Sequence, residues 1–150
     1  MQLGDRLYLI NDAYNAAPSS IEGALKVMGD LEVDVRIAVL GDMLELGEHA
    51  EELHRKVGTM VGEYGIQELI AVGDMAHWYL EGASDRLENL HTYEAAEAED
   101  ATNHLMSRLI HHLKQEKTCA VLVKGSRKIG LEKVAKVILA DFPGHEQNSH

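Results

Sequence analysis

Residues 119–127 read CAVLVKGSR, in which five consecutive apolar residues run directly into a lysine, a glycine, a serine and an arginine. An unbroken apolar run of this length is typical of a strand buried on both faces, as the strands of parallel sheets are. The polar residues after it would then lie at the carboxyl end of that strand. Ligands of open α/β sheets bind at this edge, so the stretch predicts both a fold class and the location of a site.

Four further apolar runs alternate with helical patterns along the chain. The first three end in glycine or polar residues, as residues 119–127 do, and the fourth is weaker. This β-α-β-α order predicts an α/β domain with a doubly wound, mostly parallel sheet of five to six strands and helices on both faces. The expected strands are residues 7–10, 35–40, 69–72, 89–93 and 119–123, and the expected helices are residues 19–28, 48–64, 74–80, 95–117 and 131–139.

The length of 150 residues fits one domain, which we place at residues 1–142, followed by a polar tail at residues 143–150 that we expect to be flexible. The first strand begins almost at residue 1, which suggests a domain cut from a longer chain. No apolar run approaches the ~20 residues that span a bilayer, and a single cysteine excludes a disulfide framework. We therefore expect a soluble, cytoplasmic protein.

The formal net charge of −11 argues against binding to nucleic acid or to an anionic membrane, because both need a basic surface. The charge is uneven, however: residues 1–105 carry −15 and residues 106–140 carry +6. Two interpretations stay open. The two regions are solvated helix faces of opposite sign, or the basic residues near Lys124, Arg127 and Lys128 form a local site for a carboxylate or phosphate.

Several common chemical motifs are absent from the sequence. It contains neither the GxxxxGK[ST] phosphate loop nor a GxGxxG after the first strand. The adjacent pair His111-His112 points in two directions on a helix and is expected to be solvated, while His49 and His54 lie five residues apart, which is poor spacing for metal ligands. Cys119 begins a buried strand and is expected to be an inert core thiol.

Two of the loops at strand ends are candidate binding segments. In residues 11–18, Asn and Asp followed by Pro are typical of a turn that leads into a helix, but Asp12 and Asn15 could equally hydrogen-bond a polar ligand. After the last strand, Lys124 supplies a point charge, and Arg127 supplies a planar guanidinium group that can bind a carboxylate through two hydrogen bonds. The alternative for these two cations is pairing with acidic side chains at the surface.

The loop at residues 41–47 reads GDMLELG and also allows two interpretations. Its leucine and methionine side chains could seal the helix below, with Asp42 and Glu45 accepting hydrogen bonds from backbone donors. Alternatively, Met43 and Leu44 are exposed and contact a neighbouring domain or a substrate, because exposed apolar side chains are otherwise costly.

Together these segments resemble a known family. NDAYNAAP at residues 11–18 is similar to the pattern DxYNANP, and GDMLELG at residues 41–47 and VLVKGSR at residues 121–127 match outright. Ala50, His54 and Gly58 fit the pattern A-x-x-x-H-x-x-x-G. In this order and spacing, over about residues 7–139, they resemble the C-terminal domain of the Mur ligases; Ala17 stands where that family has a second asparagine.

The resemblance implies a Rossmann-like domain that works with an N-terminal domain, which binds a UDP-sugar, and a central domain, which carries the ATP phosphate loop and Mg²⁺. The motifs are most similar to those of the member that joins D-alanyl-D-alanine to UDP-N-acetylmuramoyl-tripeptide in peptidoglycan precursor synthesis. ATP converts the tripeptide carboxylate to an acyl phosphate, the dipeptide amine attacks it, and phosphate leaves. A domain that closes over this site would keep water from the acyl phosphate.

The resemblance also implies roles for particular residues. We expect Asp12, Tyr14 and Asn15 to face the nucleotide, and Asp42, Met43, Glu45 and Leu46 to line the substrate side or a domain contact. The incoming dipeptide would be placed by Lys124, Gly125, Ser126 and Arg127. No catalytic residue and no metal ligand is expected in this chain, which alone would be inactive.

Two other functions remain in competition with this ligase assignment. The first is a stand-alone module of the same fold that binds a small carboxylate or a nucleotide without catalysis. The second is a regulatory domain of the response-regulator type, which ranks last because Asn11 and Asp12 make a poor acidic cluster.

Overall fold

A computed structural model describes residues 1–12, 16–84, 89–125 and 130–142. From β2 onward, strands and helices alternate along the chain, as expected from the sequence. The elements are β1 (Gln2–Leu3), β2 (Leu7–Asp12), α1 (Pro18–Asp30), β3 (Val35–Gly41), the 3₁₀ turn η1 (Gly47–His49), α2 (Ala50–Glu63), β4 (Glu68–Val72), α3 (Ala76–Ser84), β5 (His91–Ala95), α4 (Ala98–Lys114), β6 (Cys119–Lys124) and α5 (Glu132–Asp141).

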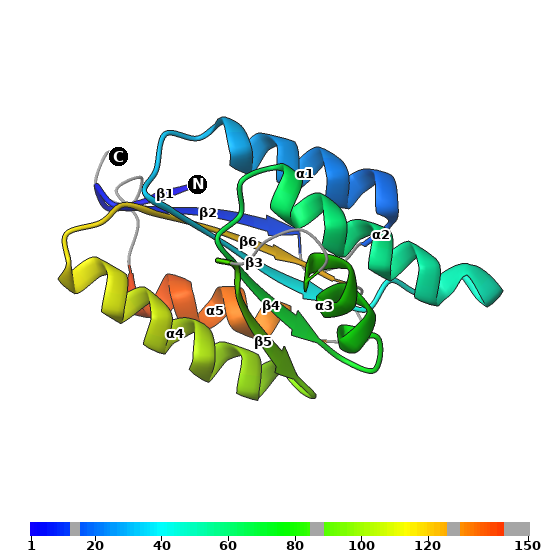
Figure 1. The fold of residues 1–150 in the computed structure, drawn as a ribbon. Helices are drawn as coiled ribbons and strands as arrows, with labels where there is room; N and C mark the ends of the chain where they lie inside the picture. Colours follow the sequence, from blue (N-terminus) through cyan, green and yellow to red (C-terminus); the bar gives the residue numbers. More distant parts are fainter. Residues whose placement is uncertain (13–15, 85–88, 126–129, 143–150) are drawn as a thin grey trace.

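The strands form one six-stranded sheet in the order β1-β2-β6-β3-β4-β5. All neighbouring pairs are parallel except β1 and β2, which are antiparallel. Helices α1, α2 and α3 cover one face of the sheet and α4 and α5 cover the other (Figure 1). The mostly parallel, doubly wound α/β fold is therefore confirmed.

Two apolar layers lie on the two faces of the sheet because successive residues of a strand point to opposite sides. Val39 of β3 packs in the layer that contains the buried residues of α4 and α5. Its neighbour Leu40 packs in the layer that contains those of α1, α2 and α3. The central strands β3, β4 and β6 are buried on both sides over most of their length, which explains why their sequences are mostly apolar.

Several element boundaries differ from those expected. The sequence did not predict β1, a two-residue strand that turns back onto β2 through Gly4 at φ 72°. Strand β5 starts two residues later than expected, and α2 starts at Ala50 because residues Gly47–His49 form a tighter 3₁₀ turn. Helix α4 ends at Lys114, three residues early, and Glu116 adopts φ 61° just after it.

Helices α2 and α3 pack unusually closely at two glycines. A Cβ atom on Gly58 would lie 2.0 Å from the carbonyl oxygen of Tyr79, and a Cβ atom on Gly82 would lie 1.9 Å from that of Arg55. Each helix thus presents a glycine to the main chain of the other. This contact fixes the two helices that support the loop after β3.

Among the described residues, none of the helices combines the length and the apolar character needed to cross a membrane.

Candidate functional site

The candidate site lies at the carboxyl edge of the sheet. The register pairs Asp12 of β2 with Lys124 of β6, and Lys124 with Leu40 of β3. On the other side of β3, Gly41 pairs with Val72 of β4. The ends of four neighbouring strands are therefore level, and the described parts of the loops that follow them begin at one edge, as the sequence predicted.

An ion pair joins two of the predicted site residues at this edge. The ammonium group of Lys124 bonds to Oδ2 of Asp12, and the Lys124 side chain is only 3% exposed, whereas that of Asp12 is 46% exposed. The family resemblance implies different ligands for these side chains, whereas the adjacency of β2 and β6 makes them partners. The lysine thus neutralises and orients a carboxylate that is half open to solvent, while a role for either residue in binding stays a prediction.

Gly125 follows Lys124 and is buried. A Cβ atom at this position would lie 2.6 Å from Cδ1 of Leu131 and 3.4 Å from the Cα atom of Gly41. A side chain would therefore push the end of β6 away from both the start of α5 and the end of β3. This packing gives a structural reason for the glycine that the sequence places directly after Lys124.

Four predicted site residues lie outside the described part of the chain. They are Tyr14, Asn15, Ser126 and Arg127. Their assignments to the nucleotide and to the dipeptide stay predictions. The same holds for the flexibility expected of residues 143–150.

The loop after β3, residues 41–47, is held at its base by three hydrogen bonds of the Tyr79 and Asp42 side chains. The Tyr79 hydroxyl donates to the Gly41 carbonyl oxygen over 2.7 Å. The Asp42 carboxylate accepts from the backbone N–H groups of Asp74 at 3.1 Å and Met75 at 2.9 Å. Asp42 thus satisfies the two backbone donors that directly precede α3, and this helix begins at Ala76, two residues later than expected from the sequence.

A fourth contact at the base of the loop involves His54 of α2. Its Nε2 atom accepts from the Met43 N–H over 2.9 Å, and its Nδ1 atom lies 2.6 Å from the Ala50 carbonyl oxygen. The side chain is fully buried, and burial lowers the pKa of His54 below its ordinary value, although Ala50 and Asp42 act in the opposite direction. The sequence argues against His54 as a metal ligand, and its signal of another role is the A-x-x-x-H-x-x-x-G pattern.

The rest of the loop divides into a buried and an exposed part. Met43 is 3% exposed and packs in the core, so the interpretation that Met43 is exposed was wrong. Leu44 is 41% exposed, Glu45 is exposed and adopts φ 62°, and Leu46 is partly buried. At its base the loop thus follows the first interpretation, in which apolar side chains pack on the core and Asp42 accepts hydrogen bonds from backbone donors. Leu44 and Glu45 at its apex are exposed and available for a contact.

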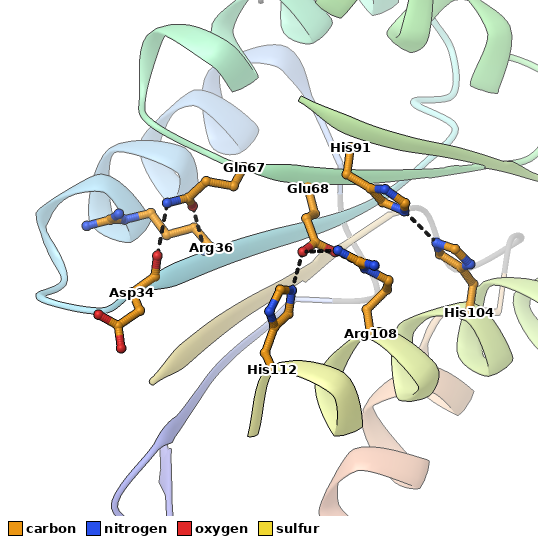
Figure 2. Close-up of polar contacts among 8 residues, drawn as sticks. All are labelled: Asp34, Arg36, Gln67, Glu68, His91, His104, Arg108 and His112. Carbon is orange, nitrogen blue, oxygen red and sulfur yellow. Dashed lines mark hydrogen bonds and ion pairs between the residues drawn. The ribbon is translucent and has the colours of Figure 1, made fainter. Parts of the chain in front are cut away.

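A second polar cluster lies at the opposite, amino-terminal edge of the sheet (Figure 2). Glu68, the first residue of β4, is buried between Arg108 at 2.7 Å and His112. His91, the first residue of β5, faces His104 with 3.0 Å between the two Nε2 atoms. These partners lie four residues apart along one face of α4, so the cluster fastens α4 to the sheet.

The cluster corrects one expectation about the histidines. His111 is exposed, as expected, but His112 is 6% exposed and is bonded to Glu68. In the described part of the chain, no group of three or more His, Cys, Asp or Glu side chains could hold a metal ion. Cys119 is buried as expected, and burial raises the pKa of its thiol to about 11.

The chain has relatives among known proteins. Residues 1–127 match the family described as Mur ligase, glutamate ligase domain. The UDP-N-acetylmuramoyl-tripeptide--D-alanyl-D-alanine ligases of Bacillus subtilis and Escherichia coli are 32% and 30% identical over 89% and 92% of this chain. The chain spans only 28% of the length of each.

Solved structures give the same result. A structure of MurF from Acinetobacter baumannii aligns with a TM-score of 0.76 and 26% identity, covering 88% of this chain and 28% of that one. MurF from Thermotoga maritima in complex with ADP aligns at 22% identity with a TM-score of 0.66, which shows the shared fold. The chain therefore belongs to the Mur ligase family, through its C-terminal glutamate ligase domain, and is homologous to MurF over most of its length.

Proposed function

We propose that this chain is the C-terminal domain of the ATP-dependent ligase that joins D-alanyl-D-alanine to UDP-N-acetylmuramoyl-tripeptide in peptidoglycan precursor synthesis. The observation that supports this best is the arrangement at the carboxyl edge of the sheet. There the Asp12–Lys124 pair and the loop at residues 41–47 lie side by side on strands β2, β6 and β3. The names of the relatives supply the reaction.

The Asp12–Lys124 pair suits the nucleotide side of this reaction. A carboxylate accepts hydrogen bonds from hydroxyl groups such as those of a ribose. An unpaired carboxylate would also repel the phosphates of ATP, and Lys124 offsets that charge within the protein. Tyr14 and Asn15 would complete the nucleotide contact from the same loop.

The segment after β6 suits the dipeptide. Arg127 offers a planar fork to the free carboxylate of D-alanyl-D-alanine, with Ser126 and the main chain at Gly125 beside it. Leu44 and Glu45, exposed at the apex of the loop after β3, would contact the substrate or a neighbouring domain. Together these loops would shield the acyl phosphate from water when the domain closes.

The remaining parts of the reaction fall to other segments of the ligase. The chain has no GxxxxGK[ST] loop, and its described residues contain no cluster of metal ligands. We propose that the central domain holds the ATP phosphates and Mg²⁺, and that an N-terminal domain holds the UDP-sugar. This chain then contributes binding and closure rather than catalytic groups.

The test of the dipeptide site uses the complete open reading frame that encodes this chain. Phosphate release should require ATP, UDP-N-acetylmuramoyl-tripeptide and D-alanyl-D-alanine together. Arg127→Ala should raise the KM for the dipeptide at least about tenfold and leave the KM for ATP nearly unchanged, because one bidentate carboxylate contact is lost. Lys136→Ala, at an exposed position of α5, is the control and should change neither constant. Equal effects of Arg127→Ala on both constants would contradict the assignment.

A second test separates the closing domain from a stand-alone binding module. The isolated chain should hydrolyse no ATP, and titration with ATP or D-alanyl-D-alanine should move amide NMR signals only at millimolar ligand, because each ligand lacks its other contacts. Tight binding of one ligand without hydrolysis would favour the stand-alone module. Robust hydrolysis of ATP by the isolated chain would contradict both functions.

A further inference from the structure

We propose that His54 is a positioning residue for the loop at residues 41–47, and that only its neutral form with the proton on Nδ1 can hold the loop. The proposal rests on the proposed function, in which the apex of this loop contacts the substrate or a neighbouring domain. It adds a residue that lies outside the three motifs at the sheet edge and acts through the main chain of the loop.

The hydrogen bonds of His54 fix its protonation state. Nε2 lies 2.9 Å from the backbone nitrogen of Met43, which is a donor, so Nε2 must accept and carry no proton. Nδ1 lies 2.6 Å from the carbonyl oxygen of Ala50, which can only accept, so Nδ1 must carry the proton. An imidazolium would set two N–H groups against each other at Met43 and break that bond.

The surroundings of His54 favour this neutral form. The ring is fully buried, and the Tyr79 ring of α3 packs edge-on against it with 4.8 Å between centroids. Among the described residues, the Asp42 carboxylate on the loop is the charged group whose interaction with His54 favours protonation. Asp42 is already bonded to the N–H groups of Asp74 and Met75 just before α3, and burial outweighs its effect, so the pKa of His54 stays below its ordinary value.

The bond to Met43 is placed where it decides the direction of the loop. Tyr79 bonds to Gly41, the turn before α3 bonds to Asp42, and His54 bonds to the next residue, Met43. Beyond Met43 the chain is exposed to solvent. Glu45 adopts φ 62°, a backbone conformation that residues other than glycine rarely adopt. Within the described parts of the chain, the Met43 N–H is thus the last hydrogen-bonded group of the loop before its exposed apex.

Two variants separate the hydrogen bond from simple packing. The side-chain oxygen of His54→Gln can reach the place of Nε2 and accept from Met43, whereas that of His54→Asn reaches only the place of Nδ1. We expect hydrogen exchange of the Met43 amide to be at least about tenfold faster in His54→Asn and to stay slow in His54→Gln. Amides of the core strands β3 and β6 should exchange slowly in both variants, which is the control for folding.

The wild-type chain provides a test that needs no variant. NMR should detect scalar coupling across the hydrogen bond between the Met43 nitrogen and His54 Nε2 at neutral pH. On acidification the coupling should disappear, and the Met43 and Leu44 amide signals should move, with the same midpoint as His54 protonation. A proton on Nε2 at neutral pH, or equal exchange of Met43 in the wild type and His54→Asn, would overturn the proposal.

Activity of the protein from the complete open reading frame tests the functional part separately. His54→Asn should lower kcat at least about fivefold, and His54→Gln should retain most of it. Equal kcat in the three proteins, with the coupling present in the wild type, would overturn the positioning role but leave the ligase function intact. Absence of ligase activity in the wild type, with the coupling present, would instead contradict the proposed function.

Discussion

Gly58→Ala is expected to lower the free energy of unfolding by about 3 kcal/mol or more, at the upper end of what overpacking a core costs. The added Cβ atom would lie 2.0 Å from the Tyr79 carbonyl oxygen and 3.1 Å from the Ala83 nitrogen. Both are main-chain atoms of α3 and cannot rotate away. The helices α2 and α3 would have to separate, which opens the buried contacts on both.

Gly82→Ala tests the same contact from the other helix, because its Cβ atom would lie 1.9 Å from the carbonyl oxygen of Arg55. Gly23→Ala is the matched control: Gly23 is in the interior of α1 with no atom within 4 Å of an added Cβ. That change should stabilise the protein by about 0.5–1 kcal/mol, because alanine is the better helix former. Urea unfolding followed by circular dichroism measures all three, and a Gly58→Ala value close to that of the wild type would refute the close packing.

The packing of α2 against α3 also affects the candidate site. His54 lies one turn before Gly58 on α2, and Tyr79 lies one turn before Ala83 on α3. Both side chains bond to the base of the loop at residues 41–47. A shift between α2 and α3 would therefore also move the loop, so surviving Gly58→Ala protein should show altered Met43 and Leu44 amide signals.

The sequence predicted the features of the fold that depend on local pattern. Buried parallel strands read as apolar runs, and their carboxyl ends share one edge of the sheet, so residues 11–12, 41–42 and 124–125 could be expected to lie together. The first strand β1 has two residues and carries too little pattern to be read. The start of α3 depends on Asp42, a side chain 32 residues earlier in the chain, which no local signal reveals.

Partnerships between distant residues account for most of what the sequence did not show. Asp12 and Lys124 are 112 residues apart, and their contact follows from the insertion of β6 between β2 and β3. His112 stands beside His111 in a helical pattern and looks solvated in the sequence, but it lies on the face of α4 that meets Glu68, 44 residues away. The residue types of such pairs can be read from a sequence, whereas their pairing follows from the order of the strands.

Glu68→Gln is expected to lower the free energy of unfolding by about 3 kcal/mol, because removing one partner of a buried ion pair leaves the other charge uncompensated. The Glu68 side chain is 4% exposed, and its two oxygens bond to Arg108 at 2.7 and 3.0 Å and to His112. The variant keeps the shape of the side chain and removes its charge. Glu94→Gln, at an exposed position of β5, is the control and should change stability by less than about 0.5 kcal/mol.

The same residue predicts how stability depends on pH. Burial alone would raise the pKa of Glu68, but the hydrogen bonds and charges of Arg108 and His112 outweigh it and hold the pKa below its ordinary value of 4.5. The contribution of Glu68 is therefore complete above pH 4.5 and is lost as the pH falls through the lower pKa of the folded protein. Between these two values the unfolded chain binds more protons than the folded one, so stability must fall with decreasing pH.

In Glu68→Gln this part of the acid-induced loss should disappear, and the plot of unfolding free energy against pH should be shallower below pH 4.5 than in the wild type or in Glu94→Gln. Arg108→Met should shift that loss toward higher pH, since it removes the first of the groups that lower the pKa of Glu68. If Glu68 and Arg108 depend on each other, the double variant will lose less unfolding free energy than the two single variants together. We expect the difference to be about 1 kcal/mol or more. Parallel acid transitions in the wild type and Glu68→Gln would instead mean that other carboxylates drive acid unfolding and that α4 does not depend on this pair.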